Sequence, residues 1–166
     1  RTNPWMQESS NKVIQQGEIV AFDTDMVGPY GYCADISRAF VVGNKFNDAQ
    51  KTLYSMAMEQ IDFNSRLIKD GVTFQEFTEK SWVLPDEYYP NRYSVMVHGI
   101  GLCDEWPAIR YPTDGGERSG TFQKNMTITV ESYIGKVGGK EGVKLEQQYL
   151  IGENGLELMS HHPLED

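Results

Sequence analysis

The spacing of apolar residues predicts a chain made mostly of short β-strands. Two runs rich in β-branched and aromatic residues, at about 18–24 and 32–42, lie on either side of the turn signal Gly28-Pro-Tyr-Gly31. Two runs joined by a turn of this kind predict a β-hairpin. The remaining predicted strands are at about 93–97, 126–135, 143–152 and 155–159.

One long segment has instead the period of an amphipathic helix. Asn47 is a favourable N-cap for it, and Gly71 suits the position just after its end. Between them, residues of the buried face recur three and four positions apart, namely Leu53, Met56, Ala57, Gln60, Ile61, Asn64, Leu67 and Ile68. A shorter helix is predicted from about Thr73 to Val83, and residues 103–125 are expected to be mostly irregular. The pattern predicts an α+β fold, with an antiparallel sheet and helices on its outer face.

Acidic residues fall inside or at the ends of several predicted strands, where a charge is costly unless it is paired or bound to a metal. With one histidine, the set is Asp23, Asp25, Asp35, His98, Glu131 and Glu146. Asp23 and Asp25 are two apart and share one face of a strand, and the hairpin would bring Asp35 opposite them. Glu131 and Glu146 are expected to meet in the same way on neighbouring antiparallel strands.

These residues form a suitable ligand set for a pair of metal ions. Carboxylate oxygens with a single imidazole suit Mn, Fe, Co or Zn, and the ligands alone do not choose among them. Two-metal sites need bridging carboxylates, and Asp35 and Glu146 are the candidates for that role. Any one of the acids could be a solvent-facing strand residue. The whole set favours a metal site, because His98 is also flanked by Gly99 and Gly101, which would let another group approach the imidazole.

Composition narrows the class of protein. The 166 residues suffice for a single domain with a sizeable core, and the formal net charge of −9 argues against nucleic acid or an anionic membrane as partner. Two divalent ions would offset about four of these charges. No apolar stretch is long enough to span a bilayer, and Cys33 and Cys103 do not make a disulfide framework. We therefore expect reduced thiols and a cytoplasmic location.

Several segments resemble one family. The first signal is the order Asp, Asp, His, Glu, Glu along the chain. The second is a set of segments, namely His98-Gly-Ile-Gly-Leu102, Thr127-Ile-Thr-Val-Glu131, Lys144-Leu-Glu-Gln147 and Glu153-Asn-Gly-Leu-Glu-Leu-Met-Ser160. This combination, spread over most of residues 17–160, resembles the M24 family of pita-bread metallopeptidases, which includes methionine aminopeptidases, prolidases and creatinases. The resemblance implies a pita-bread fold and a dinuclear site. The ligands that it implies are Asp23, Asp35, His98, Glu131 and Glu146.

Three features depart from the peptidase pattern. Prolidase-like members read His-Gly-x-Gly-x-x-x-His-Glu-x-Pro after the metal histidine, whereas Asp104 here takes the place of the second histidine, with one residue deleted before Pro107. Asp25 adds a carboxylate, and residues 1–22 contain no histidine. An anionic Asp104 holds a peptide oxyanion poorly, because that task needs a hydrogen-bond donor or a positive charge. Peptide hydrolysis is therefore less favoured.

In these departures the chain resembles one branch of the family, the lyases of dimethylsulfoniopropionate (DMSP). The similarity lies in Pro4-Trp5, Phe22-Asp-Thr-Asp-Met26, Gly28-Pro-Tyr-Gly-Tyr-Cys-Ala-Asp-Ile-Ser-Arg38 and Asp104. It implies that Asp25 joins the other five residues as a sixth ligand. It also implies a β-elimination that gives dimethyl sulfide and acrylate.

Such an elimination needs a base for the proton α to the carboxylate, and metals that bind this carboxylate and stabilise the enolate-like charge. Asp104, six residues beyond His98, is the candidate base. Aromatic faces suit a sulfonium cation, and the candidates are Trp5, Tyr30, Tyr32 and Trp106, each of which could instead serve only in packing. The alternatives are a metallo-aminopeptidase or prolidase-like hydrolase, and a binding module without catalysis.

The chain begins with Arg1, and we expect residues 1–166 to be a partial catalytic domain. By comparison with the pita-bread fold, the N-terminal domain and the first part of the catalytic fold would be absent. The exposed sheet edge and apolar face would then favour a homo-oligomer, and a fragment can be inactive as purified. The expected partner is a small-molecule substrate, either DMSP or a short peptide.

Overall fold

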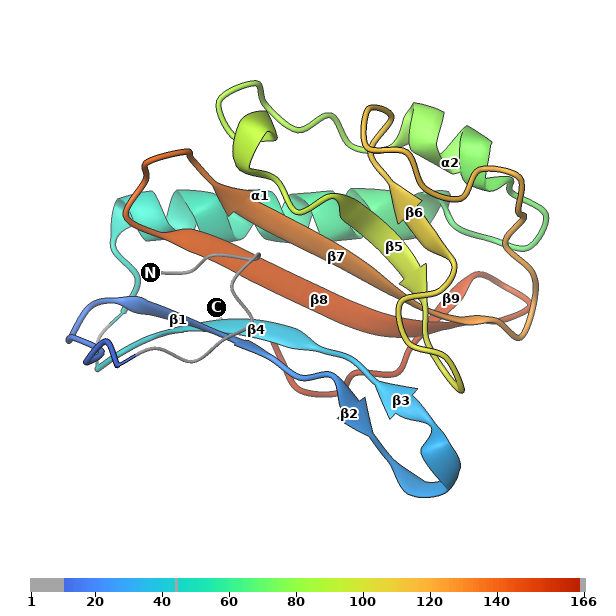
Figure 1. Ribbon diagram of the computed structural model, residues 1–166, viewed down its shortest axis with the longest axis horizontal. Helices are drawn as coiled ribbons and strands as arrows, with labels where there is room; N and C mark the ends of the chain where they lie inside the picture. The colour runs from blue at the N-terminus through green and yellow to red at the C-terminus, as the bar shows by residue number, and fades with distance from the viewer. Residues whose placement is uncertain (1–10, 44, 165–166) are drawn as a thin grey trace.

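The computed structural model describes residues 11–43 and 45–164 (Figure 1). Its main element is a five-stranded antiparallel sheet in the order β6-β5-β7-β8-β9. The strands are β5 (Val95–Gly99), β6 (Ala108–Arg110), β7 (Thr127–Gly135), β8 (Gly142–Ile151) and β9 (Leu156–Leu158). The predicted antiparallel sheet is confirmed. Residues 103–125 are mostly irregular, as predicted, apart from the short edge strand β6.

The predicted N-terminal hairpin is split into two small antiparallel sheets. They are formed by β1 (Ile19–Asp23) with β4 (Ser37–Val41), and by β2 (Met26–Val27) with β3 (Cys33–Ala34). At the break, the Asp35 amide donates to Gln148 Oε1 on β8, and the Thr24 hydroxyl donates to the Ile36 carbonyl. Asp23 therefore pairs with Ser37, and Asp35 lies outside the ladder rather than opposite Asp23 as expected.

The split hairpin reaches from the main sheet into open space. β4 lies beside β8, whereas β2 and β3 extend away from the body of the molecule, with a short 3₁₀ helix, Pro29–Gly31, at their turn (Figure 1). The break between the two small sheets thus separates a packed half from a projecting half. Asp35 lies at this break, where the chain turns towards β8.

Two helices flank the sheet, and α1 runs behind β7 and β8 (Figure 1). α1 (Asp48–Leu67) begins with a capping box between Asn47 and Gln50, as its sequence predicts. It ends at Leu67, earlier than expected, and the amide of Gly71 bonds instead to the Phe122 carbonyl. α2 (Phe74–Lys80) is capped by Thr73, and a second 3₁₀ helix covers Tyr89–Asn91.

The core lies between the sheet and the helices. Phe77, Phe122 and Met96 are fully buried, and Phe122 packs edge-on against Phe74 with ring centroids 4.8 Å apart. The predicted buried face of α1 is confirmed, and it includes the polar residue Gln60. The amide of Gln60 is satisfied there by the Tyr111 and Ser132 hydroxyls. In the described part of the chain, no helix combines the length and apolarity that a membrane crossing requires.

The capping box supplies a prediction for fold stability. Replacing Asn47 by Ala removes the acceptor for the Gln50 amide and should lower the free energy of unfolding by about 1 kcal/mol. Asn47→Asp keeps a capping oxygen and should stay within about 0.5 kcal/mol of the parent chain. Urea denaturation measures both, and an Asn47→Ala variant as stable as the parent would show that the cap contributes nothing.

Candidate metal centre

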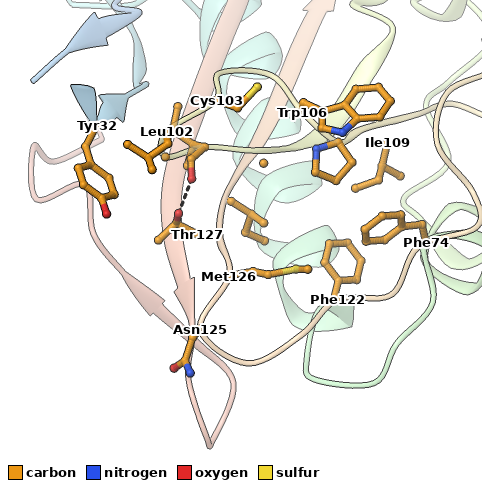
Figure 2. Close-up of a pocket in the computed structure, with 15 residues that line it drawn as sticks. Tyr32, Phe74, Leu102, Cys103, Trp106, Ile109, Phe122, Asn125, Met126 and Thr127 are labelled. Atoms are coloured by element: carbon orange, nitrogen blue, oxygen red, sulfur yellow. Dashed lines mark hydrogen bonds between the residues drawn. The ribbon is translucent and has the colours of Figure 1, made fainter. Parts of the chain in front are cut away.

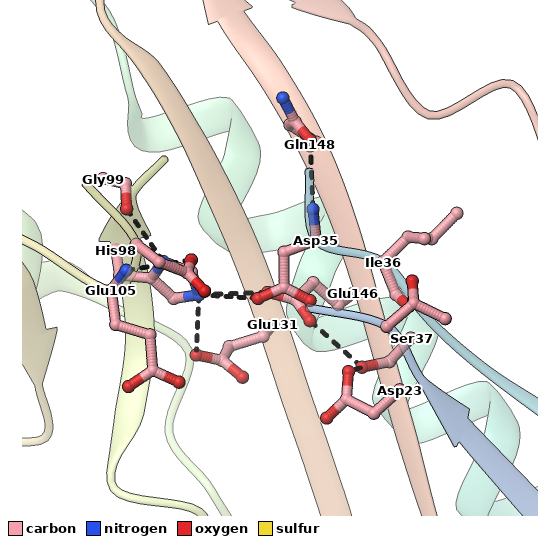
Figure 3. Close-up of polar contacts among 12 residues, drawn as sticks. Asp23, Asp35, Ile36, Ser37, His98, Gly99, Glu105, Glu131, Glu146 and Gln148 are labelled. Atoms are coloured by element: carbon pink, nitrogen blue, oxygen red, sulfur yellow. Dashed lines mark hydrogen bonds and ion pairs between the residues drawn. The ribbon is translucent and has the colours of Figure 1, made fainter. Parts of the chain in front are cut away.

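Five of the six predicted ligands are brought together by different elements of the fold. Glu131 on β7 lies directly opposite Glu146 on β8, as the sequence predicts, because the register of these long strands pairs the two positions. His98 comes from β5, on the other side of β7. Asp23 ends β1, and Asp35 lies between β3 and β4. The carboxylates of Asp35, Glu131 and Glu146 converge on the imidazole of His98 (Figure 3).

The contacts of His98 define the centre of this cluster. Its Nε2 lies 3.2 Å from Glu146 Oε1, 3.5 Å from Asp35 Oδ2 and 3.8 Å from Glu131 Oε1. These four residues are buried, each at most 3% exposed, whereas the Asp23 side chain is half exposed. His98 Nδ1 lies 3.0 Å from the carbonyl of Gly99, which helps to fix the plane of the ring. Nε2 therefore faces the carboxylates.

Three overlapping groups of ligand atoms lie close enough to hold metal ions. In each, the atoms are within 4.8 Å of one another; the groups are His98 with Glu131 and Glu146, Asp23 with Asp35 and Glu146, and Asp35 with His98 and Asp104. Asp35 and Glu146 each belong to two groups, which is the arrangement that bridging carboxylates require.

The chemistry of the cluster fits a divalent transition metal. Two buried carboxylate oxygens, Asp35 Oδ1 and Glu131 Oε1, have no hydrogen-bond partner. A buried acceptor without a donor is costly, and a cation would satisfy both oxygens. Carboxylates with one imidazole are also a suitable donor set for such an ion. The arrangement can therefore hold metal and polarise an oxygen of a substrate bound there.

Comparison with known proteins identifies the family of this chain. The family model for metallopeptidase family M24 matches residues 1–153. The chain belongs to family M24. The chain is 41% identical to a DMSP lyase, DddP, of Roseovarius nubinhibens and 39% identical to one of Roseobacter denitrificans, each over 99% of this chain. It spans 38% of the length of these curated relatives.

A solved M24-type structure agrees in fold. The prolidase from Pyrococcus furiosus superposes with a TM-score of 0.76 at 26% identity, over 93% of this chain and 44% of that one. The expected pita-bread fold is thereby confirmed, with a sheet that carries acidic residues and helices outside it. The relatives are named as lyases and the structural neighbour as a peptidase, so membership of family M24 does not by itself fix the reaction.

The predicted base Asp104 lies beside the cluster of predicted metal ligands, on the loop that follows β5. One carboxylate oxygen is within 4.8 Å of ligand atoms of Asp35 and His98. Asp104 Oδ1 accepts a hydrogen bond from the amide of Glu105, which has a left-handed φ of 55°. This local bond holds one carboxylate oxygen of Asp104 against its own loop.

Gly99 has a different role from the predicted one. A Cβ at this position would lie 2.1 Å from the carbonyl oxygen of Trp106, so the glycine lets the loop fold back against β5. The Gly99 amide also donates to the Pro107 carbonyl at 2.9 Å. The expected close approach to the imidazole is thus an approach of backbone to backbone, and it carries Asp104 towards the ligands.

Asp25 is the ligand that the structure leaves outside the cluster. It is exposed and belongs to none of the three groups, although its charge helps to raise the pKa of Asp35. The prediction that Asp23 and Asp25 share one face of a strand is wrong, because β1 ends at Asp23. Asp25 lies in the short break before β2, where strand alternation no longer applies.

The predicted aromatic residues are only partly brought together. Tyr32 and Trp106, both more than half exposed, line an apolar cavity of about 370 Å³ between the 100–107 loop and the start of β7 (Figure 2). Tyr30 is 96% exposed, at the tip of the β2–β3 turn, and does not line this cavity. Trp5 lies outside the described residues.

One side chain of the cluster is not predicted from the sequence. Lys144 is buried on β8, and its Nζ lies 2.5 Å from Glu131 Oε2, 3.4 Å from Glu146 Oε2 and 3.7 Å from Asp23 Oδ2. Its position two residues before Glu146 was the available signal, because residues two apart in a strand face the same side. The hydroxyl of Ser37 adds a contact of 3.0 Å to Glu146 Oε2.

Burial and close contacts shift the pKa values of the groups in this cluster. Burial works to lower the pKa of His98, but hydrogen bonds with Asp35 and Glu146 outweigh it and raise this pKa to about 11. Burial raises the pKa of Asp35 and of Glu131. Burial also works to raise the pKa of Glu146, but Lys144 and His98 outweigh it and hold this pKa below its usual range.

Metal binding should therefore release protons. Because the pKa values of the hydrogen-bonded pair His98 and Asp35 are both raised, we expect this pair to keep at least one proton at pH 7 without metal, whereas metal ligands must be deprotonated, so binding should release about one proton or more. Because protons compete for raised-pKa ligands, the apparent Mn²⁺ affinity should rise with pH between 6 and 8. Calorimetric titration in two buffers of different ionisation enthalpy measures the release, and equal heats in both would contradict it.

Proposed function

We propose that this chain carries the dinuclear metal centre and the base of a DMSP lyase, which cleaves DMSP to dimethyl sulfide and acrylate by β-elimination. The observation that carries the proposal is Asp104, a carboxylate close to Asp35 and His98 at the position where prolidase-like members have histidine. The curated relatives at 41% and 39% identity are named as lyases of this substrate.

Asp104 performs the proton transfer in this proposal. Its carboxylate takes the proton from the carbon α to the substrate carboxylate, the electron pair forms the α–β double bond, and the bond from the β carbon to sulfur breaks. Dimethyl sulfide leaves with the electron pair of the broken carbon–sulfur bond, and acrylate remains. The amide of Glu105 holds one carboxylate oxygen of Asp104 and leaves the other available for the proton.

The proposed cofactors are two divalent transition-metal ions, of Fe, Mn, Co or Zn. Their proposed ligands are Asp23, Asp25, Asp35, His98, Glu131 and Glu146. When bound, the ions would hold the substrate carboxylate and stabilise the negative charge that develops as the α proton leaves. The geometry supports five of these ligands, and Asp25 would have to turn inward to become the sixth.

Aromatic side chains near the loop suit the other end of the substrate. A sulfonium cation is attracted to the faces of Trp and Tyr rings. Trp106 and Tyr32 share one cavity next to the Asp104 loop, which supports a role for them in binding this group. Tyr30 and Trp5 are proposed for the same role from the chemistry of their rings alone.

A metallo-aminopeptidase or prolidase-like hydrolase is the second candidate. The fold of the Pyrococcus furiosus prolidase supports it. Against it stands Asp104, because an anionic carboxylate repels the oxyanion of a tetrahedral intermediate. A binding module without catalysis is disfavoured, since a scaffold does not need buried carboxylates with unpartnered oxygens.

The proposal extends to the domain context, the oligomeric state and the location of the protein. Residues 1–166 would be one part of an M24 catalytic domain, since they span 38% of the curated relatives. We further propose a homo-oligomer in the cytoplasm that acts on a small-molecule substrate. Exposed apolar residues on the β2–β3 hairpin, among them Met26 and Val27, offer a surface for such contacts.

Replacing Asp104 by Asn tests the proposed reaction. The variant keeps the shape of the side chain but removes the base, so dimethyl sulfide release from DMSP should fall by about 100-fold or more, with unchanged metal content. Gas chromatography of the headspace and metal analysis measure the two quantities on Fe-, Mn- or Zn-loaded protein. Asp86→Asn, at an exposed loop position, is the matched control and should keep full activity.

Two results would overturn the lyase proposal. One is an Asp104→Asn variant that releases dimethyl sulfide at the parent rate, which would remove the assigned base. The other is turnover of Xaa-Pro dipeptides by the parent protein without any release of dimethyl sulfide, which would favour the hydrolase.

A further inference from the structure

The buried ammonium of Lys144 lies among the carboxylates that are proposed to bind metal. Its Nζ contacts Glu131 at 2.5 Å and Glu146 at 3.4 Å, with Ser37 Oγ at 3.2 Å. The residue is 6% exposed, so bulk water screens these contacts little. It is part of the cluster rather than a surface charge.

Lys144 and His98 divide the oxygens of the two glutamates between them. Lys144 lies against Oε2 of both Glu131 and Glu146, whereas His98 faces Oε1 of both. The unpartnered oxygens, Glu131 Oε1 and Asp35 Oδ1, belong to side chains that face His98. Lys144 thus leaves the His98 side of the glutamates available to a metal ion.

Without this ammonium, the metal-free cluster would be poorly compensated. Glu131 and Glu146 lie directly opposite each other on paired strands, a position in which like charges repel. Leaving a buried charge without its partner is strongly destabilising. In the described residues, the only cationic side chain with an ion pair to Glu131 or Glu146, apart from His98, is Lys144.

We propose that Lys144 is a built-in counter-cation that holds Glu131, Glu146 and Asp23 together before metal binds, and that the same charge weakens metal binding. Both effects follow from one position. A positive charge among acids stabilises the empty site, and the same charge repels an incoming divalent ion a few ångströms away. This inference rests on the proposed metal centre but not on the proposed reaction. Lys144 is a positioning residue, since it acts through the ligands.

Thermal unfolding of the 166-residue chain with and without Mn²⁺ tests the proposal. In Lys144→Met the metal-free protein, prepared with a chelator, should lose roughly 10 °C in Tm. Its increase in Tm on adding saturating Mn²⁺ should exceed that of the parent by several degrees, because the empty site is raised in free energy and the repulsion is gone. Calorimetric titration should show tighter Mn²⁺ binding by about tenfold or more.

Two variants serve as controls. Lys144→Arg keeps the charge, so its increase in Tm with Mn²⁺ should resemble that of the parent even where the larger side chain lowers both Tm values. Lys124→Met removes an ammonium from the exposed pair with Glu153 and should change neither the metal-free Tm nor the Mn²⁺ response.

Each remaining outcome counts against the inference. It fails if Lys144→Met matches Lys124→Met in the metal-free state, if it is unfolded both with and without Mn²⁺, or if Lys144→Arg behaves as Lys144→Met. A parent chain that binds Mn²⁺ alongside any of these results keeps the proposed metal centre. A parent chain without any Mn²⁺ response would remove the metal centre itself and, with it, the second half of the inference.

Discussion

The structure depends on a repulsion that the fold creates and must then balance. Pairing of β7 with β8 places Glu131 directly opposite Glu146 in a buried part of the sheet. Two buried carboxylates that face each other in this way oppose folding unless cationic groups lie next to them. The rest of the site supplies that charge from two sides, through the imidazole of His98 and the ammonium of Lys144.

The small sheet of β1 and β4 brings the remaining acidic residues to the cluster around His98. β4 packs beside β8, and the broken hairpin turns Asp35 towards His98 instead of towards β1. This break replaces regular pairing with side-chain bonds, so the position of Asp35 depends on tertiary contacts with Gln148. The loop after β5 approaches from the opposite direction, since Gly99 permits its close return. Residues distant in sequence meet because the end of β1, the break between β3 and β4 and the end of β5 all lie beside the middle of β7 and β8.

Much of this site could be predicted from the sequence because strand periodicity and motif order are local signals. Glu131 and Glu146 follow from the register of two long strands, and His98 follows from the glycine-rich segment after β5. Local pattern does not indicate Lys144, because lysine on a strand is ordinarily a solvated residue and its burial here depends on partners on β1 and β7. The position of Asp25 differs from the prediction because strand alternation stops where β1 ends, at Asp23. The return of the loop at Gly99 depends on a contact that no local pattern encodes.

The split between the small β1–β4 sheet and the main sheet has a consequence for motion. The β1–β4 sheet contacts the main sheet chiefly through β8, so loss of this one interface would release β1 and β4 as a local unit. A metal ion shared by Asp23 or Asp35 with Glu146 would tie the layers together as a covalent cross-link does, by restricting the separated states of the chain. Amide hydrogen exchange in these two strands would then report directly on occupancy of the centre, independently of any turnover.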